Sequence, residues 1–173
     1  MFYPLKYIMI SLLEIAYLLL TTIAIGYIFS RETSWRELKL SCLIAAPGVV
    51  LHELAHKFLA ISFGLNADFK IFFFGILAGV ILRLVNSPVI LVAPGYVNIP
   101  QVANSLHYRL IAFAGPATNL LIWLICLAIL KYKTKLTRKS ALLFMLTKRI
   151  NGVLFLFNMI PFGPLDGAKV LFG

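Results

Sequence analysis

The fold depends on residues 40–64, LSCLIAAPGVVLHELAHKFLAISFG, an apolar run that carries His52, Glu53 and His56 near its centre. A helix of about 20 apolar residues crosses the hydrocarbon core of a bilayer, which is about 30 Å thick. Gly64 closes the run, and glycine is the residue that most often ends a helix. The stretch therefore predicts a membrane-spanning helix with two histidines and a glutamate at bilayer depth.

The composition of the whole chain agrees with a membrane protein. Of the 173 residues, 61% are hydrophobic and 13% are charged, and the mean hydropathy is +0.96. A soluble domain is typically about 45–50% apolar and about 25% charged. The composition therefore excludes a soluble globular protein, a disordered chain and a nucleic-acid-binding module, although the net charge is +10. The length allows about four to six spans, so we expect an integral, multi-pass protein of the cell membrane.

Four apolar runs predict the membrane-spanning helices. They cover about residues 8–29, 40–63, 109–130 and 141–160. Ser34 and Glu37, in the polar loop after the first run, have the spacing of a capping box at the start of the second helix. We therefore expect an all-α polytopic membrane protein with four or more transmembrane helices.

The segment between the second and third helices, residues 65–104, has a different pattern. It is apolar over much of its length, but glycines and prolines interrupt it. Clusters of aromatic and β-branched residues at 69–74 and 89–92 predict a small β-hairpin or a re-entrant element. One full transmembrane helix is the alternative. Irregular backbone at membrane depth is stable only where protein covers it or where it lines a wet cavity.

The H-E-x-x-H pattern of residues 52–56 predicts a metal site. His52 and His56 are four residues apart, so a helix places both imidazoles on one face, close enough to bind one metal ion. Glu53 can take a proton from water at the metal, as in zinc hydrolases. The alternative is a histidine pair hydrogen-bonded between helices. However, His52 lies roughly 18 Å along the helix, and titratable groups at that depth are costly without an ion.

A zinc ion in a catalytic site has three protein ligands and one open position. Glu14, Asp68, His107 and Asp166 are the candidates for the third ligand. Three of them have another explanation: Glu14 can be paired with a buried donor, Asp68 can belong to a turn, and His107 can lie at the membrane interface. Asp166 follows residues 161–164, PFGP, where a helix must break, and such a break lets a short carboxylate project into a cavity. Capping of the next helix is the alternative role for Asp166.

Three segments resemble the site-2 protease family of intramembrane zinc metalloproteases, which is peptidase M50-like. Residues 52–64 resemble the H-E-x-x-H-x7-G segment of that family, and residues 114–119, AGPATN, resemble its Gly-Pro-x-x-Asn helix. Residues 158–167, NMIPFGPLDG, resemble its N-x-x-P-x-P-x-L-D-G segment, except that Gly163 stands where the family often has a second proline. We expect one membrane-embedded metalloprotease domain over residues 1–173. Residues 1–39 would form a peripheral first helix and loop, and residues 40–173 the catalytic core.

The resemblance implies a role for each residue of the motifs. One Zn²⁺ ion would be bound by the side chains of His52, His56 and Asp166. Glu53 would be the general base. Two amides near the metal would position the substrate or stabilise the oxyanion, and these belong to Asn119 and Asn158.

The resemblance also implies an activity, which is hydrolysis of peptide bonds within or near the transmembrane segments of membrane proteins in the lipid bilayer (regulated intramembrane proteolysis). A substrate helix must unwind locally, because its backbone groups are paired internally. A strand edge between residues 69 and 100 would capture the unwound chain. One alternative is a metal-ion or proton transporter that uses His52, His56 and Asp166, although a transporter has no need of Glu53. The other alternative is a catalytically inactive scaffold, and the oligomeric state is open.

Two arguments about membrane orientation disagree. Five basic residues lie in the loop at 131–139, and such loops are usually cytoplasmic. If residues 65–104 do not cross the bilayer, the loop at 30–39 lies on the same side. The resemblance implies a metal-binding helix that runs from the outside toward the cytosol, which places both loops outside. A full crossing at 71–92 would make the basic loop cytoplasmic but would invert the later helices relative to the family.

Overall fold

The structure is a computed structural model of the chain, and it describes residues 10–173 except 31, 33, 89–92 and 100–103. The described part is mostly helical and includes one small sheet. Its elements, in chain order, are α1 (Leu12–Phe29), α2 (Trp35–Ser62), β1 (Asp68–Ile71), α3 (Phe73–Leu84), β2 (Gly95–Asn98), α4 (Ser105–Tyr132), α5 (Arg138–Asn158) and α6 (Asp166–Phe172).

Each of the four predicted apolar runs forms a helix, and these helices are α1, α2, α4 and α5. The second helix begins earlier than the apolar run, at Trp35, because the Ser34 hydroxyl accepts a hydrogen bond from Glu37 N at 3.2 Å. It ends at Ser62 with Phe63 as its cap, and the next residue, Gly64, has a φ of 76°, which is typical of the glycine that follows a helix. The first helix begins at Leu12, and residues 8 and 9 of the predicted run lie outside the described part.

The segment between α2 and α4 forms a short antiparallel sheet and a short helix. Strand β1 pairs with β2, from Asp68 opposite Asn98 to Ile71 opposite Gly95. The segment is therefore not one continuous helix, and the predicted small β element is confirmed as a two-stranded sheet whose strands are separated by α3. The predicted strand at 69–74 is wrong beyond Ile71, because Phe72 already caps α3. The predicted strand at 89–92 lies outside the described residues.

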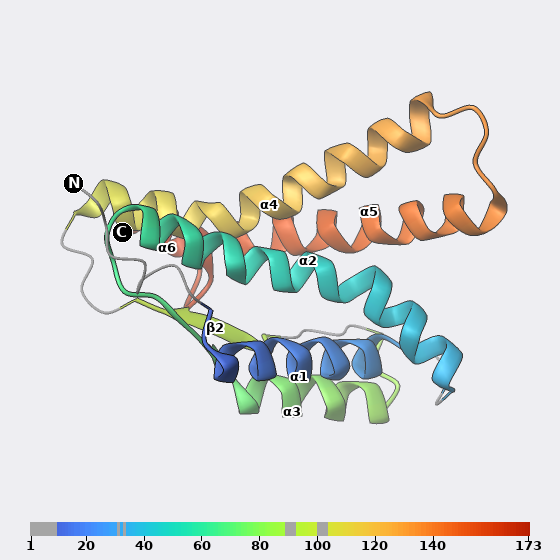
Figure 1. Cartoon of the computed structure of the whole chain (residues 1–173), viewed down its shortest axis with the longest axis horizontal. Helices are drawn as coiled ribbons and strands as arrows, with labels where there is room; N and C mark the ends of the chain where they lie inside the picture. The colour runs from blue at the N-terminus through green and yellow to red at the C-terminus, as the bar shows by residue number, and fades with distance from the viewer. Residues whose placement is uncertain (1–9, 31, 33, 89–92, 100–103) are drawn as a thin grey trace.

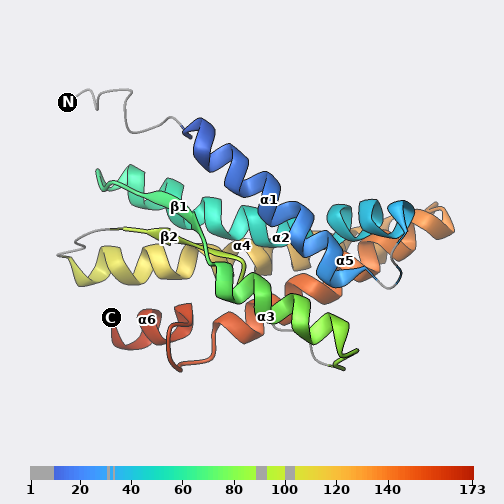
Figure 2. The same ribbon diagram turned by 90° about the horizontal axis from the view of Figure 1, so that it is seen from below.

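The helices pack around α2, which runs through the centre of the molecule (Figure 1). It contacts α1 on one side and α4 and α5 on the other, and α4 and α5 form an antiparallel hairpin. Helix α3 lies beside α1, and the sheet and α6 lie toward one end of the bundle (Figure 2). The end of α1, the start of α2 and the α4–α5 loop lie at the other end (Figure 1).

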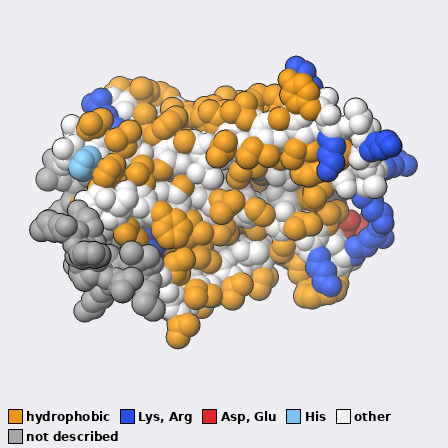
Figure 3. Space-filling model, turned by 45° about the horizontal axis from the view of Figure 1, so that its top comes forward, with side chains coloured by type: hydrophobic (Ala, Val, Ile, Leu, Met, Phe, Trp, Pro, Cys, Tyr) orange, Lys and Arg blue, Asp and Glu red, His pale blue; other side chains and the backbone are white. Residues whose placement is uncertain are grey.

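The interior is small and the exterior is apolar. One buried cluster joins α1 to α2 through Ile25, Ala45, Ala46 and Val49. Many large hydrophobic side chains are exposed instead, and they cover the middle of the molecule while Lys and Arg gather mainly at the end with the α4–α5 loop (Figure 3). By length and composition, α1, α2, α4 and α5 are each able to span a membrane. Helix α3 has 12 residues, about 18 Å, and is too short to cross one.

A buried ion pair fastens the first helix to the rest of the protein. Glu14 is 5% exposed and Lys57 is 3% exposed, and the Lys57 ammonium group donates to Glu14 Oε1. The same oxygen accepts from Phe69 N at 2.8 Å, and Glu14 Oε2 accepts from Ser11 N at 2.9 Å. One carboxylate therefore joins the start of α1 to α2 and to β1.

Replacing one partner of this pair should destabilise the protein. Lys57→Met leaves the Glu14 charge buried without its cation, with only the two backbone N–H donors, and we expect the free energy of unfolding to fall by about 3–5 kcal/mol. The double variant Glu14→Gln, Lys57→Met leaves no charge and should be more stable than Lys57→Met alone. Denaturant unfolding of the purified proteins measures both effects. A double variant that is less stable than the single one would contradict the buried pair.

Candidate metal centre

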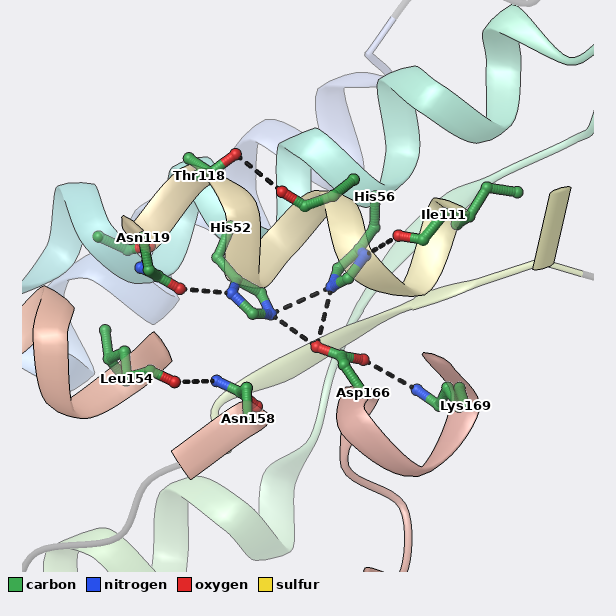
Figure 4. Close-up of polar contacts among 11 residues, drawn as sticks. His52, His56, Ile111, Thr118, Asn119, Leu154, Asn158, Asp166 and Lys169 are labelled. Carbon is green, nitrogen blue, oxygen red and sulfur yellow. Dashed lines mark hydrogen bonds and ion pairs between the residues drawn. The ribbon is translucent and has the colours of Figure 1, made fainter. Parts of the chain in front are cut away.

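Three buried side chains from distant parts of the chain meet at one point. His52 Nε2 lies 3.0 Å from His56 Nε2 and 3.0 Å from Asp166 Oδ2. His56 Nε2 lies 3.2 Å from the same oxygen. Each of the three residues is 7% exposed. Figure 4 shows the two imidazoles pointing from α2 toward the carboxylate of α6. The three residues form a group that is able to hold a metal ion.

The backbone break after α5 brings the carboxylate to the histidines. Helix α5 ends at Asn158, and the chain turns through a segment that contains Gly163 before α6 begins. Gly163 has a φ of 60°, a left-handed conformation that proline cannot adopt, which explains why proline is absent there. Asp166 is the first residue of α6, and Leu165 occupies the cap position. The alternative role of Asp166 as a helix cap is therefore wrong.

The outer nitrogens of the two imidazoles are both hydrogen-bonded. His52 Nδ1 donates to Asn119 Oδ1 at 2.6 Å, and His56 Nδ1 donates to the carbonyl oxygen of Ile111 at 2.6 Å. These oxygens only accept hydrogen bonds, so both Nδ1 atoms carry a proton, and in a neutral ring Nε2 is then the unprotonated nitrogen. Each Nε2 then presents a lone pair to the centre, beside an oxygen of Asp166. This tautomer is the one in which a histidine binds a metal through Nε2.

The donor set fits a single zinc ion. Two imidazole nitrogens and one carboxylate oxygen are the ligands of many catalytic zinc sites. Tetrahedral bonds of about 2.0–2.1 Å place neighbouring ligand atoms about 3.3 Å apart, and the three inner atoms here are 3.0 to 3.2 Å apart. Three acceptors at this distance repel one another, and a shared cation removes the repulsion.

Gly115, in helix α4, leaves room for the two rings. A Cβ atom at this position would lie 2.3 Å from His56 Nε2 and 2.5 Å from His52 Nε2. Any larger residue would therefore displace the two nitrogens that face the carboxylate. The glycine of the AGPATN segment has a steric role at the metal centre.

A cavity of about 710 Å³ lies beside the three residues. Residues of α2, β2, α4, α5 and α6 line it, and they include Glu53, Asn158 and Lys169. Glu53 is half-buried. Asn158 Nδ2 donates to Leu154 O at 3.0 Å, and Lys169 Nζ donates to Asp166 Oδ1 at 3.2 Å. The cavity has the size of a typical ligand site.

The amide of Asn119 lies behind His52. Its side chain is fully buried, and Nδ2 donates to Gly48 O at 3.0 Å and to Asn151 Oδ1 at 2.9 Å. Both the oxygen and the nitrogen of the amide are therefore engaged within the protein. Asn119 is not among the described residues that line the cavity, so its contacts run to His52 rather than to a bound molecule.

The other candidates for the third ligand lie apart from the group. Glu14 is held by Lys57, which agrees with the buried-pair explanation. Asp68 is the exposed first residue of β1. The ring of His107 stacks on Phe63, with ring centroids 4.0 Å apart. Among the described residues, Asp166 is the acidic residue that joins the two histidines.

Several residues at the centre were not predicted from the sequence. They are Asn151, the carbonyl of Ile111 and Gly115. A buried amide in an apolar run is costly unless it has a partner, so the position of Asn151 within the run at 141–160 is a signal in the sequence for a buried polar contact. The carbonyl of Ile111 leaves no such signal, because only packing between helices brings it to the histidines. Gly115 belongs to the AGPATN motif, but the motif does not indicate its steric role.

The fold and the site together define a helical protein with a single-zinc centre of the hydrolase type. The chain is 33% identical over 163 residues to a protein of Methanocaldococcus jannaschii named "Putative zinc metalloprotease", and the match covers 91% of this chain and 83% of that protein. It is 32% identical over 143 residues to a Synechocystis protein of the same name, covering 82% of this chain and 33% of that protein. No family model and no solved structure matches the chain. The chain belongs to the zinc metalloprotease family of these relatives.

Removal of any one of the three side chains should abolish tight zinc binding. Loss of a residue that merely supports a ligand typically costs about 10–100-fold in metal affinity, so we expect His56→Ala or Asp166→Ala to cost more than about 100-fold. Zinc competition with a chromogenic chelator measures the affinity. The control is His107→Ala, which removes an imidazole outside the group and should leave the affinity unchanged. Zinc affinity that survives in Asp166→Ala would contradict this site.

Proposed function

We propose that the chain is an intramembrane zinc metalloprotease of the site-2 protease type. It hydrolyses peptide bonds within or near the transmembrane segments of membrane-protein substrates. The observation that carries the proposal is the buried His52, His56 and Asp166 group beside a cavity that Glu53 also lines. The naming of both relatives as zinc metalloproteases supports the reaction class.

The surface of the protein supports a location within a bilayer. Four helices have the length and hydropathy of membrane spans, and in α5 only 6% of the most apolar window is buried inside the protein. Contiguous exposed apolar surface of this extent is unusual in a soluble monomer. We therefore assign the exposed apolar band of Figure 3 to contact with lipid, and the metal centre to the interior of the bundle.

The side chains at the cavity divide the work of hydrolysis. His52, His56 and Asp166 hold the zinc ion. Zinc supplies a Lewis acid that polarises a carbonyl and lowers the pKa of water. Glu53 takes a proton from the attacking water as the C–O bond forms, and gives a proton to the amide nitrogen as the C–N bond breaks. Asn158 lines the cavity and positions the substrate.

The outer edge of β2 is the proposed receptor for the unwound substrate. Phe72 N donates to Pro94 O at 3.0 Å, so the backbone groups of Pro94 point toward the strand that contains β1. Along an antiparallel strand, the N–H and C=O groups of successive residues point alternately toward the partner strand and away from it. The N–H and C=O groups of Gly95 and Val97 therefore point away from β1. Both residues line the cavity beside the metal centre. An extended peptide can add to such an edge through main-chain hydrogen bonds.

The opposite edge of the sheet is occupied by the first helix. Phe69 N points outward from β1 and donates to the Glu14 carboxylate at 2.8 Å. A peptide strand would have to displace this charged acceptor to pair with β1. The edge of the sheet that is open to a substrate strand is therefore the β2 edge, which faces the cavity. No comparable feature supports the transporter alternative.

Glu53→Gln tests the proposed reaction. Loss of a general base typically costs about 10²–10⁴-fold in rate, so cleavage of a transmembrane peptide in vesicles should fall by at least about 10²-fold while the zinc content stays the same. The matched control is Glu37→Gln in the first turn of α2, which should cleave normally. Zinc-loaded wild type that cleaves nothing would favour the inactive scaffold, and zinc or proton flux into the vesicles would favour the transporter.

Val97→Pro tests the strand edge. Proline has no N–H, so the variant loses one outward hydrogen-bond donor, and kcat/KM should fall about tenfold, in line with a hydrogen bond of about 1–1.5 kcal/mol. Val97→Ala is the control, because it shortens the side chain and keeps the N–H. Zinc affinity should be unchanged in both variants. Equal activity of the proline and alanine variants would discard this edge as the receptor.

A further inference from the structure

A chain of buried hydrogen bonds connects the backbone of α5 to the ring of His52. Asn151 Nδ2 donates to Thr147 O at 2.9 Å. Asn119 Nδ2 donates to Asn151 Oδ1 at 2.9 Å, and His52 Nδ1 donates to Asn119 Oδ1 at 2.6 Å. Asn119 and Asn151 are both 0% exposed. The two amides are therefore closed to solvent, and the hydrogen bond from Asn151 to Thr147 O is part-buried.

The direction of every hydrogen bond in this chain is determined. Thr147 O only accepts, so the nitrogen of the Asn151 amide must face it and the oxygen must face Asn119. Asn119 then turns its nitrogen toward Asn151, and its oxygen toward His52. A flip of either amide would oppose two donors or two acceptors in a buried site. The proton of His52 is therefore held on Nδ1, and Nε2 is left free to bind a metal.

The two histidines differ in how their protons are held. His56 Nδ1 donates directly to a backbone carbonyl, that of Ile111. His52 Nδ1 donates instead to the side chain of Asn119, whose own nitrogen is held by Asn151 Oδ1 and by Gly48 O. The position of the His52 ring is therefore sensitive to residues that have no contact with the metal centre.

The same contacts hold α2, α4 and α5 together beside the centre. Asn119 Nδ2 also donates to Gly48 O of α2 at 3.0 Å. Asn151 lies two turns before the end of α5, and the segment that follows α5 delivers Asp166. A change at Asn151 would therefore act on His52 through the relay and on Asp166 through the seating of α5.

We propose that Asn151 is a positioning residue of the metal centre, which sets the tautomer and orientation of His52 through Asn119. This inference rests on the proposed zinc site and adds a residue to it. Asn151 touches neither the zinc ligands nor the cavity among the described residues. Asn151 affects the zinc affinity and the ligand geometry of the metal site, and through them catalysis.

The test compares Asn151→Leu with Asn151→Asp. Leucine removes the acceptor for Asn119, so zinc affinity should fall about 10–100-fold and the visible absorption bands of the cobalt-substituted protein should shift. Aspartate should restore both, because burial keeps the carboxyl protonated, and its O–H and C=O then match the donor and acceptor of the amide. Thr118→Val is the control, since Thr118 bonds only to Ala114 O in its own helix, and should bind both metals as the wild type does.

Each outcome of this comparison decides a separate point. Wild-type zinc affinity and cobalt bands in Asn151→Leu would overturn the role of Asn151 and leave the proposed function intact. Equal losses in Asn151→Leu and Thr118→Val would also overturn it. A wild type that binds neither metal would overturn the proposed function as well. If the leucine variant does not fold, Asn151→Ala takes its place, because it removes the same acceptor without adding bulk, and wild-type zinc affinity in that variant overturns the role of Asn151.

Discussion

The structure depends on the convergence of three hydrogen-bond acceptors inside an apolar bundle. The Nε2 atoms of His52 and His56 and one oxygen of Asp166 lie 3.0 to 3.2 Å apart, and hydrogen bonds at the far side of both rings use Nδ1 as the donor, so that each Nε2 faces this point. Such an arrangement is unfavourable by itself and favourable around a divalent cation. Much of the surrounding fold serves to hold these atoms in place.

Each neighbouring element meets one requirement of this arrangement. The helical spacing of α2 places both rings on one face, and Gly115 of α4 gives them room. The turn at Gly163 brings the carboxylate back to α2. The buried pair of Glu14 and Lys57 fastens β1 to the helix that carries the histidines. The strand edge that faces the cavity is thereby held beside the metal centre, although the first helix contributes no side chain to the metal-binding group.

Much of this architecture follows from local patterns in the sequence. The apolar runs predicted α1, α2, α4 and α5, and the H-E-x-x-H spacing with the broken segment before Asp166 predicted the residues that meet. The predicted strand at 69–74 failed in its second half, because aromatic side chains favour strands and lipid-facing helices alike. The relay through Asn151 was missed for another reason. Contacts between helices that are far apart in the sequence leave no spacing pattern, and only the assembled bundle brings Asn119 and Asn151 together.

X-ray absorption spectroscopy of the purified wild-type protein, combined with metal analysis, tests the central claim most directly. The account predicts one zinc ion per chain, with two imidazole nitrogens and oxygen ligands at about 2.0–2.1 Å. A protein with no stoichiometric zinc, or a zinc shell that contains sulfur or only one imidazole, would contradict it.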